Sequence, residues 1–130
     1  MAKLEKYQMY IGGEWTDPAS GEWFESINPF TSKPWALFAR GNAEDAGRAV
    51  AAAKKALNSP QWRDLTATGR GHLLRRLGDL ITENADRLAE IEVKDNGKLI
   101  AEMGMQLKSL PQWYYYFAGL ADKIEGAVLP

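Results

Sequence analysis

The sequence predicts an α-dominant α+β fold, with a small N-terminal hairpin and strand portion over about residues 8–39 and three to four helices over about residues 43–125. Two observations predict this division. Short β-prone segments between Gly and Pro turns occupy the first 39 residues, and apolar residues spaced three and four apart begin only after Asn42. At 130 residues, with 45% hydrophobic content, the chain is long enough to bury one core.

The β portion is predicted to contain a hairpin and two further strands. Residues 8–11 are β-prone, Gly12-Gly13 supplies a two-residue turn that tolerates positive φ, and residues 14–16 return as the second strand. Residues 22–27 are again extended, and Asn28-Pro29 follows because proline moves the residue before it away from helical geometry. Residues 35–39 predict one more short strand.

The first helix is predicted over residues 43–57. Asn42 is its cap, and Glu44 and Asp45 lie near the positive end of the helix dipole. Its apolar face is expected to contain Ala46, Val50, Ala53 and Leu57.

Two more helices are predicted before residue 97. The second begins near Thr66 and places five apolar residues on one face, namely Leu73, Leu74, Leu77, Leu80 and Ile81. Asn84 caps the third, and Asn96-Gly97 ends it with residues that tolerate the left-handed conformation. Asp95 then lies at the negative end of a helix dipole, so a compensating contact is expected for its carboxylate.

A last helical pattern runs from Leu99 to about Ile124, and Pro111 interrupts it. Proline offers no N–H to the Leu107 carbonyl, so a kink or a break into two helices is expected. Five successive aromatic residues, 113–117, point all around this helix. They indicate packing against further sequence or a second subunit; the functional alternative is a substrate-channel lining or a cage over a quaternary ammonium group.

Composition excludes several classes of function. Lys and Arg total 16 against 17 Asp and Glu, so a net charge of -1 provides no field that would concentrate nucleic acid or anionic lipid. No signal sequence or membrane-spanning run is visible, and a cytoplasmic protein is expected. The absence of cysteine excludes disulfides, thiolate metal sites and a cysteine nucleophile within these residues.

Several short motifs, taken in order, resemble the N-terminus of the NAD(P)-dependent aldehyde dehydrogenase superfamily. The markers are residues 10–15, Ile27-Asn28-Pro29, the basic and leucine-rich residues 70–81, residues 88–92, Asp95-Asn96-Gly97-Lys98 and residues 116–123. Within the superfamily, Tyr10-Ile11-Gly12-Gly13 is most similar to the betaine-aldehyde dehydrogenase type.

The resemblance implies that residues 1–130 are the N-terminal part of the cofactor-binding domain, an incomplete part of the family's α/β fold. The Rossmann core, the catalytic domain and the oligomerisation strands would then be absent. The intact enzyme would use NAD or NADP to oxidise an aldehyde, betaine aldehyde being one candidate, and would be a homo-oligomer. The fragment alone is expected to be inactive, to bind no cofactor, and to self-associate or pair with the remainder of the enzyme chain.

The resemblance assigns no catalytic or cofactor-binding residue to this chain, but it does imply two other sites. Relatives hold a monovalent cation, potassium or sodium, with backbone carbonyls near the pair before Asn-Pro and with the carboxylate of Asp-Asn-Gly-Lys, which correspond here to Ser26, Ile27 and Asp95. Such oxygen ligands suit a hard cation, and one further ligand is expected from sequence outside these residues. The alternative is that Asp95 only accepts hydrogen bonds from backbone N–H groups of its turn. Met105 and Ser109 correspond to positions near the substrate entrance.

A rival hypothesis is a stand-alone, non-catalytic helical interaction module derived from the same segment. The aromatic run around Tyr115 would then be its binding surface. His72, the only histidine, has no catalytic constellation near it in the sequence and is expected to be an ordinary helix residue. The identity of the aldehyde and the choice between NAD and NADP are left open.

Overall fold

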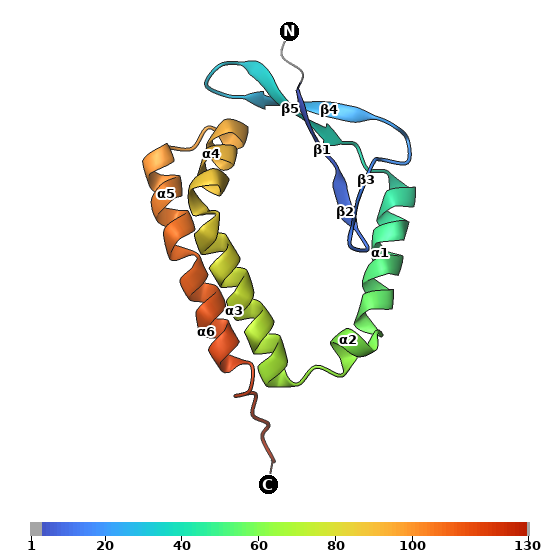
Figure 1. Cartoon of the computed structure of the whole chain (residues 1–130), viewed down its shortest axis with the longest axis vertical. Helices are drawn as coiled ribbons and strands as arrows, with labels where there is room; N and C mark the ends of the chain where they lie inside the picture. Colours follow the sequence, from blue (N-terminus) through green and yellow to red (C-terminus); the bar gives the residue numbers. More distant parts are fainter. Residues whose placement is uncertain (1–3, 130) are drawn as a thin grey trace. The chain divides into compact units, whose positions relative to one another are not determined.

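The structure, a computed structural model, describes residues 4–129, which form five strands and six helices (Figure 1). Helices predominate and the strands come first, so the predicted fold class is confirmed. The described residues divide into two compact units. The first contains the residues up to Arg63 together with Lys94–Gly97, and the second contains Asp64–Val93 and the residues from Lys98 onward.

The first unit contains two small sheets. Strand β5 (Lys33–Ala39) lies in the middle of a three-stranded sheet, parallel to β1 (Glu5–Tyr7) and antiparallel to β4 (Trp23–Asn28). Strands β2 (Met9–Ile11) and β3 (Glu14–Thr16) form the predicted hairpin. Its turn has φ of 65° at Gly12 and 93° at Gly13, a left-handed conformation that glycine adopts without strain.

Helix α1 (Ala43–Leu57) has the predicted bounds. The Asn42 side chain accepts hydrogen bonds from the N–H groups of Glu44 and Asp45, and the Asp45 carboxylate accepts one from the Asn42 N–H in return, which completes a capping box. The four residues of its predicted apolar face are all exposed among the described residues. The hairpin turn packs instead beside Ala52, and no other described element of this unit covers the face of Val50 and Leu57.

A short helix, α2 (Pro60–Arg63), follows α1 in the chain. Pro60 is its first residue, a position at which the missing proline N–H leaves no intrahelical bond unmade.

The second unit is built from four helices. They are α3 (Ala67–Glu83), α4 (Ala85–Asn96), α5 (Ile100–Ser109) and α6 (Pro111–Leu120), and the end of α4 from Lys94 onward belongs to the first unit. Pro111 begins α6, so the predicted break is confirmed, although α6 ends at Leu120 rather than near Ile124. The buried apolar core is small and contains Ala85, Ala89, Met103 and Leu107.

Helices α3 and α6 run side by side (Figure 1). Two buried glycines of α3 allow this approach, since a Cβ on Gly71 would lie 2.7 Å from the Ala118 carbonyl oxygen and one on Gly78 would lie 2.6 Å from Cε1 of Tyr115. Contacts of real Cβ atoms are essentially never that short, so a side chain at either position would force Tyr115 or the backbone of α6 to move.

Asn84 was predicted to cap α4, but its side chain makes its hydrogen bond to α3. Its side-chain amide and its backbone N–H both donate to the Leu80 carbonyl, so Asn84 ends α3 instead. Only Asn84 separates α3 from α4, and its amide nitrogen is turned toward the preceding helix, where it satisfies the open Leu80 carbonyl.

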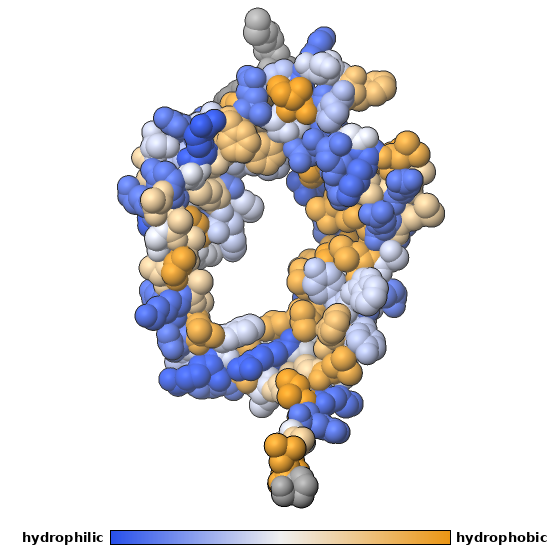
Figure 2. Space-filling view, turned by 180° about the vertical axis from the view of Figure 1, so that it is seen from behind, coloured by the Kyte–Doolittle hydropathy of each residue, from blue (hydrophilic) through white to orange (hydrophobic). Residues whose placement is uncertain are grey.

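Large apolar side chains are exposed on the helical unit (Figure 2). Trp113, Tyr116 and Phe117 of α6 are more than half exposed, whereas Tyr114 and Tyr115 are half-buried. The prediction that the aromatic run cannot be covered by these residues alone is therefore confirmed. None of the described helices is long and apolar enough to cross a membrane.

Candidate functional site

Ser26 and Asp95 are 69 residues apart in the sequence but meet in the first unit. Ser26 lies on β4, Asp95 lies in the last turn of α4, and the Ser26 hydroxyl donates a hydrogen bond of 2.6 Å to Oδ1 of Asp95. This is the compensating contact expected for a carboxylate at the negative end of a helix dipole. The observed donor is a side-chain hydroxyl rather than a backbone N–H of the same turn.

Two predicted motifs pack against each other beside this hydrogen bond. Gly97 ends α4 with φ of 76°, and a Cβ built on it would lie 3.1 Å from Cβ of Pro29. The Asn28 side chain in turn accepts hydrogen bonds from the N–H groups of Phe30 and Thr31, which closes the turn after β4. The Asn-Pro and Asp-Asn-Gly-Lys motifs together therefore hold Asp95 against β4.

The pairing of β4 with β5 is irregular at this point. Ser26 pairs with Ala36, but the next pair is Ile27 with Pro34, so Trp35 is an extra residue on β5. The indole Nε1–H of Trp35 donates a 2.9 Å hydrogen bond to the Ser26 hydroxyl oxygen. The sequence analysis did not predict the contact of Trp35 with Ser26. The available signal was Pro34, because proline inside a strand commonly marks a bulge.

An open depression of about 440 Å³ lies at this site, lined by Phe24, Glu25, Ser26, Ile27, Phe38 and Asp95. Asp95 is exposed and Ser26 is half-buried. Among the described residues no group of three His, Cys, Asp or Glu side chains could hold a metal ion. The chemistry available here is therefore one or two carboxylates together with hydroxyl and backbone oxygens, a donor set that suits a hard monovalent cation and not a transition metal.

Met105 and Ser109 lie one helical turn apart on α5 in the second unit. Met105 is 68% exposed, and the exposed Ser109 hydroxyl donates a 3.0 Å hydrogen bond to the Gln106 carbonyl. Residues spaced by four share one face of a helix, so both can contribute to the same surface.

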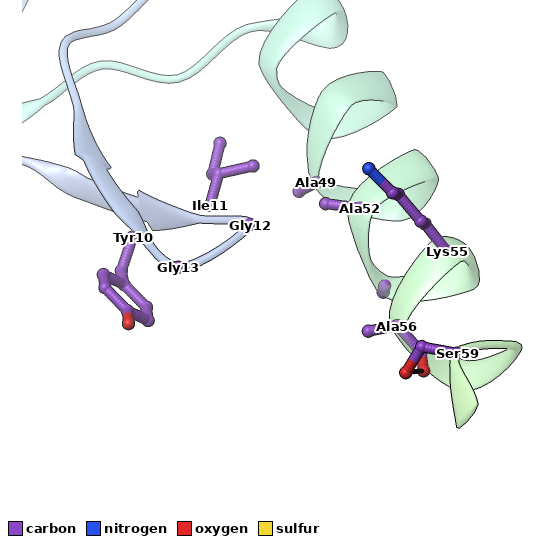
Figure 3. A pocket seen from close by; sticks show the side chains of 10 residues that line it. Tyr10, Ile11, Gly12, Gly13, Ala49, Ala52, Lys55, Ala56 and Ser59 are labelled. Atoms are coloured by element: carbon purple, nitrogen blue, oxygen red, sulfur yellow. Dashed lines mark hydrogen bonds between the residues drawn. The ribbon is translucent and has the colours of Figure 1, made fainter. Parts of the chain in front are cut away.

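A larger pocket, of about 610 Å³, lies between the hairpin turn and α1 (Figure 3). The hairpin turn at Gly12-Gly13 lies opposite a side of α1 that carries Ala49, Ala52 and Ala56, and Tyr10, Ile11, Lys55 and Ser59 also line the pocket. Its lining is mostly alanine, glycine and the apolar Ile11, and Tyr10 and Lys55 are its titratable residues. The pocket is a place where another apolar element can pack and shows no catalytic chemistry.

Asp45 is a buried carboxylate with a structural role in the first unit. Asp45 is 3% exposed and accepts hydrogen bonds from Arg48, from the Asn42 N–H at 3.0 Å and from the Ala19 N–H at 3.1 Å. The hydrogen bond from Arg48, with help from the two N–H groups, holds the pKa of Asp45 below its usual value despite burial. Asp45 thus joins the turn after β3 to the start of α1.

Comparison with known proteins identifies what this arrangement resembles. A family profile described as "Aldehyde dehydrogenase family" matches residues 15–130. The chain is 42% identical over 127 residues to (Z)-2-((N-methylformamido)methylene)-5-hydroxybutyrolactone dehydrogenase of Acinetobacter baylyi, covering 98% of this chain and 26% of that protein. It is 43% identical over 130 residues to mitochondrial aldehyde dehydrogenase of Sus scrofa, covering 95% of this chain and 24% of that protein.

Solved structures agree with the sequence matches. A betaine aldehyde dehydrogenase point mutant from Staphylococcus aureus, in complex with NAD+, matches with a TM-score of 0.88 and 35% identity, over 95% of this chain and 25% of that one. An aldehyde dehydrogenase mutant from Bacillus cereus matches with a TM-score of 0.90 and 35% identity, over 97% of this chain and 26% of that one. The chain thus spans about a quarter of the length of the relatives that it matches.

Proposed function

The chain belongs to the aldehyde dehydrogenase family, and from this premise we propose that it serves as the N-terminal part of an NAD(P)-dependent enzyme that oxidises an aldehyde to the carboxylate. The observation that carries the proposal is the family match over residues 15–130 together with a TM-score of 0.90 over 97% of the chain. The family resemblance implies a cysteine thiolate that attacks the aldehyde and a Glu that activates water. These residues contain no cysteine, so we propose that the chemistry belongs to further sequence.

Within that enzyme, residues 1–130 are proposed to support the cofactor-binding domain without touching the reacting atoms. The exposed apolar face of α1 and the exposed aromatics of α6 support this role, because each requires a covering partner. The remainder of the enzyme chain is the proposed partner for both. Alone, the 130 residues are proposed to be inactive and to self-associate.

The finer features of the enzyme are proposed from the relatives. NAD is the proposed cofactor because the structural neighbours from Staphylococcus aureus are NAD+ complexes. Betaine aldehyde is the first substrate to test, since those neighbours are betaine aldehyde dehydrogenases and the chain shares the Tyr10-Ile11-Gly12-Gly13 opening. We also propose that the complete enzyme is a cytoplasmic homo-oligomer.

A monovalent cation site at Ser26, Ile27 and Asp95 belongs to the same proposal. The fit rests on the donor chemistry: an exposed carboxylate lies beside an edge strand, and Pro34 opposite Ile27 has no N–H to occupy a carbonyl of that strand. Asp95→Ala in the complete enzyme should remove any potassium dependence of the melting temperature. Asp86→Ala on the same helix is the matched control and should leave that dependence unchanged. An unaltered potassium dependence in Asp95→Ala would refute the site.

Met105 and Ser109 are proposed to lie near the substrate entrance. Replacing the exposed Met105 by alanine in the complete enzyme should change KM for bulky aldehydes while leaving the melting temperature unchanged, because its side chain makes few internal contacts. Lys108→Ala, an exposed neighbour on α5, is the control. Identical KM values for Met105→Ala and the parent enzyme across aldehydes of different size would remove Met105 from the entrance.

The test of the main proposal begins with the DNA beyond the codon for Pro130. The protein from the complete reading frame should form NADH at 340 nm with an aldehyde and NAD, whereas residues 1–130 alone should form none. An open frame that encodes a Gly-rich dinucleotide turn, a Glu and a Cys supports the enzyme. A stop codon directly after Pro130, combined with a well-behaved folded monomer, would favour the stand-alone interaction module instead.

A further inference from the structure

Trp35 occupies an unusual place in the sheet beside the proposed cation site. Because β5 carries one extra residue between the Ala36 and Pro34 pairs, Trp35 has no cross-strand partner of its own. Bulges of this kind bend a strand and redirect a side chain. Here the indole reaches across to the Ser26 hydroxyl on β4, 2.9 Å away.

The direction of the hydrogen bonds between Trp35, Ser26 and Asp95 follows from their chemistry. An indole N–H can only donate and an ionised carboxylate can only accept. The Ser26 oxygen must therefore accept from Trp35, and its single hydrogen must point to Oδ1 of Asp95, at 2.6 Å. A free serine hydroxyl would rotate among several orientations, whereas this one has a single orientation that satisfies both neighbours.

This arrangement orients the Asp95 carboxylate. Oδ1 is engaged by the Ser26 hydroxyl, and among residues 4–129 no further hydrogen bond or ion pair holds Asp95. Asp95 lines the depression with Ser26 and Ile27, so its second oxygen is available to a ligand there. The same bulge places Pro34 of β5 opposite Ile27 of β4. Because proline has no N–H, β5 lacks one backbone donor beside Ile27.

We propose that Trp35 is a positioning residue for the cation site: through the Ser26 hydroxyl it holds the Asp95 carboxylate in the orientation that binds a monovalent cation. The inference rests on the proposed cation site. Trp35 touches no ligand and acts only through Ser26. Hydrogen-bonding partners of metal ligands contribute typically about 10–100-fold to metal affinity, so removing the indole N–H should weaken potassium binding by about tenfold.

Trp35 also packs against aromatic neighbours, and a test must separate the two roles. Its ring centroid lies 5.8 Å from that of Tyr7 and 5.9 Å from that of Phe38. Trp35→Phe keeps an aromatic ring beside Tyr7 and Phe38 and removes only the N–H donor and part of the ring. Trp15→Phe is the matched control, because Trp15 is 67% exposed and belongs to the hairpin.

The experiment uses the complete protein and measures the melting temperature as potassium chloride replaces N-methylglucamine chloride at constant ionic strength. The potassium concentration at half-maximal stabilisation should rise about tenfold in Trp35→Phe and in Ser26→Ala. It should be unchanged in Trp15→Phe, and Ser26→Thr, which keeps the hydroxyl, should bind potassium more tightly than Ser26→Ala. The double variant Trp35→Phe/Ser26→Ala should be no weaker than Ser26→Ala alone, because the indole acts only through the hydroxyl.

The outcomes distinguish failure of the proposed role of Trp35 from failure of the cation site. A parent-like potassium midpoint in Trp35→Phe, with potassium dependence lost in Asp95→Ala, overturns the role of Trp35 and leaves the cation site standing. Additive effects of Trp35→Phe and Ser26→Ala overturn it as well, since they show independent actions. Absence of any potassium effect on the parent protein refutes the cation site itself. If Trp35→Phe fails to fold, the difference between Ser26→Thr and Ser26→Ala still decides whether the hydroxyl orients Asp95.

Discussion

The ring of Tyr115 lies directly over Gly78, so close that a Cβ on Gly78 would come within 2.6 Å of the ring carbon Cε1. The same tyrosine donates a 2.9 Å hydrogen bond from its hydroxyl to Oδ1 of Asp79, and the guanidinium of Arg75 lies 5.6 Å from its ring centroid. A single residue of the aromatic run therefore joins α6 to three positions of α3. Its neighbours Trp113 and Tyr116 remain largely exposed.

Gly78→Ala should destabilise the protein. The added methyl group forces the Tyr115 ring or the whole of α6 to move, and overpacking of this kind typically costs about 1–3 kcal/mol. The measurement is the free energy of unfolding of the complete protein by urea denaturation. Gly119→Ala is the matched control, since a Cβ at this exposed helical position meets nothing within 4 Å and should stabilise slightly. Equal stability of the two variants would contradict the close packing of α3 and α6.

Tyr115→Phe should cost about 1 kcal/mol of unfolding free energy, because it leaves a half-buried Asp79 without its tyrosine donor while the ring packing is retained. Tyr116→Phe removes the hydroxyl of a ring that is 61% exposed and should be neutral. A thermal denaturation series of both variants measures the difference. If Tyr116→Phe is the more damaging of the two, the assignment of Tyr115 as the tyrosine that packs on α3 is wrong.

The aromatic run also permits a test of the channel-lining alternative. Trp113 is 64% exposed and lines an apolar pocket with Leu74, Leu110, Tyr114 and Phe117. If this surface only packs against further sequence, Trp113→Ala and Tyr116→Ala should lower the melting temperature of the complete enzyme and leave KM for the aldehyde unchanged. An altered KM at unchanged stability would instead support contact with substrate.

The parts of the fold that the sequence predicts well are those determined by neighbours in the chain. The bounds of α1 follow from the Asn42 cap, and the start of α6 follows from the missing N–H of Pro111. Strand β1 was missed because residues 5–7 pair with β5 about thirty residues later, and three residues carry too little periodicity to reveal it. The exposure of the apolar face of α1 could not be deduced from the sequence, because burial depends on which element packs there and periodicity alone does not show it.

The candidate site was predictable only in part. The resemblance placed Ser26 and Asp95 at one site, and the structure does bring them together. The contact of Trp35 with Ser26 depends on a one-residue bulge, and without a known partner strand the register of β5 cannot be deduced from the sequence. Pro34 was the local sign that the pairing is irregular there.

Gly97→Ala should destabilise the junction that holds Asp95. Gly97 has φ of 76°, a conformation that an L-residue adopts with strain, and the new Cβ would lie 3.1 Å from Pro29. The two effects together should cost about 1–3 kcal/mol of unfolding free energy. Gly47→Ala is the control, since this glycine of α1 has an ordinary φ and meets nothing within 4 Å. Comparable stability of the two variants in urea denaturation would show that the junction tolerates a side chain.

Asp45 should make the stability of the protein depend on pH in the acidic range. Its pKa is lowered in the folded state by the hydrogen bond from Arg48 and by two backbone N–H groups, whereas the unfolded chain has the ordinary value of about 3.9. Because the folded state binds the proton less readily, the stabilisation from Asp45 is fully present above the unfolded pKa. It is lost as the pH falls through the folded pKa.

Asp45→Asn should therefore be less stable than the parent protein at pH 7 and show a smaller loss of stability on acidification below about pH 4. Glu44→Gln is the matched control, because Glu44 is exposed and precedes Asp45 in the same helical turn. Urea denaturation at a series of pH values measures both effects. Parallel pH profiles for Asp45→Asn and the parent would show that another carboxylate is responsible. The Asp45 bonds to Ala19 and Asn42 would then hold the turn to α1 through geometry alone, since a neutral side-chain carbonyl can accept the same N–H groups.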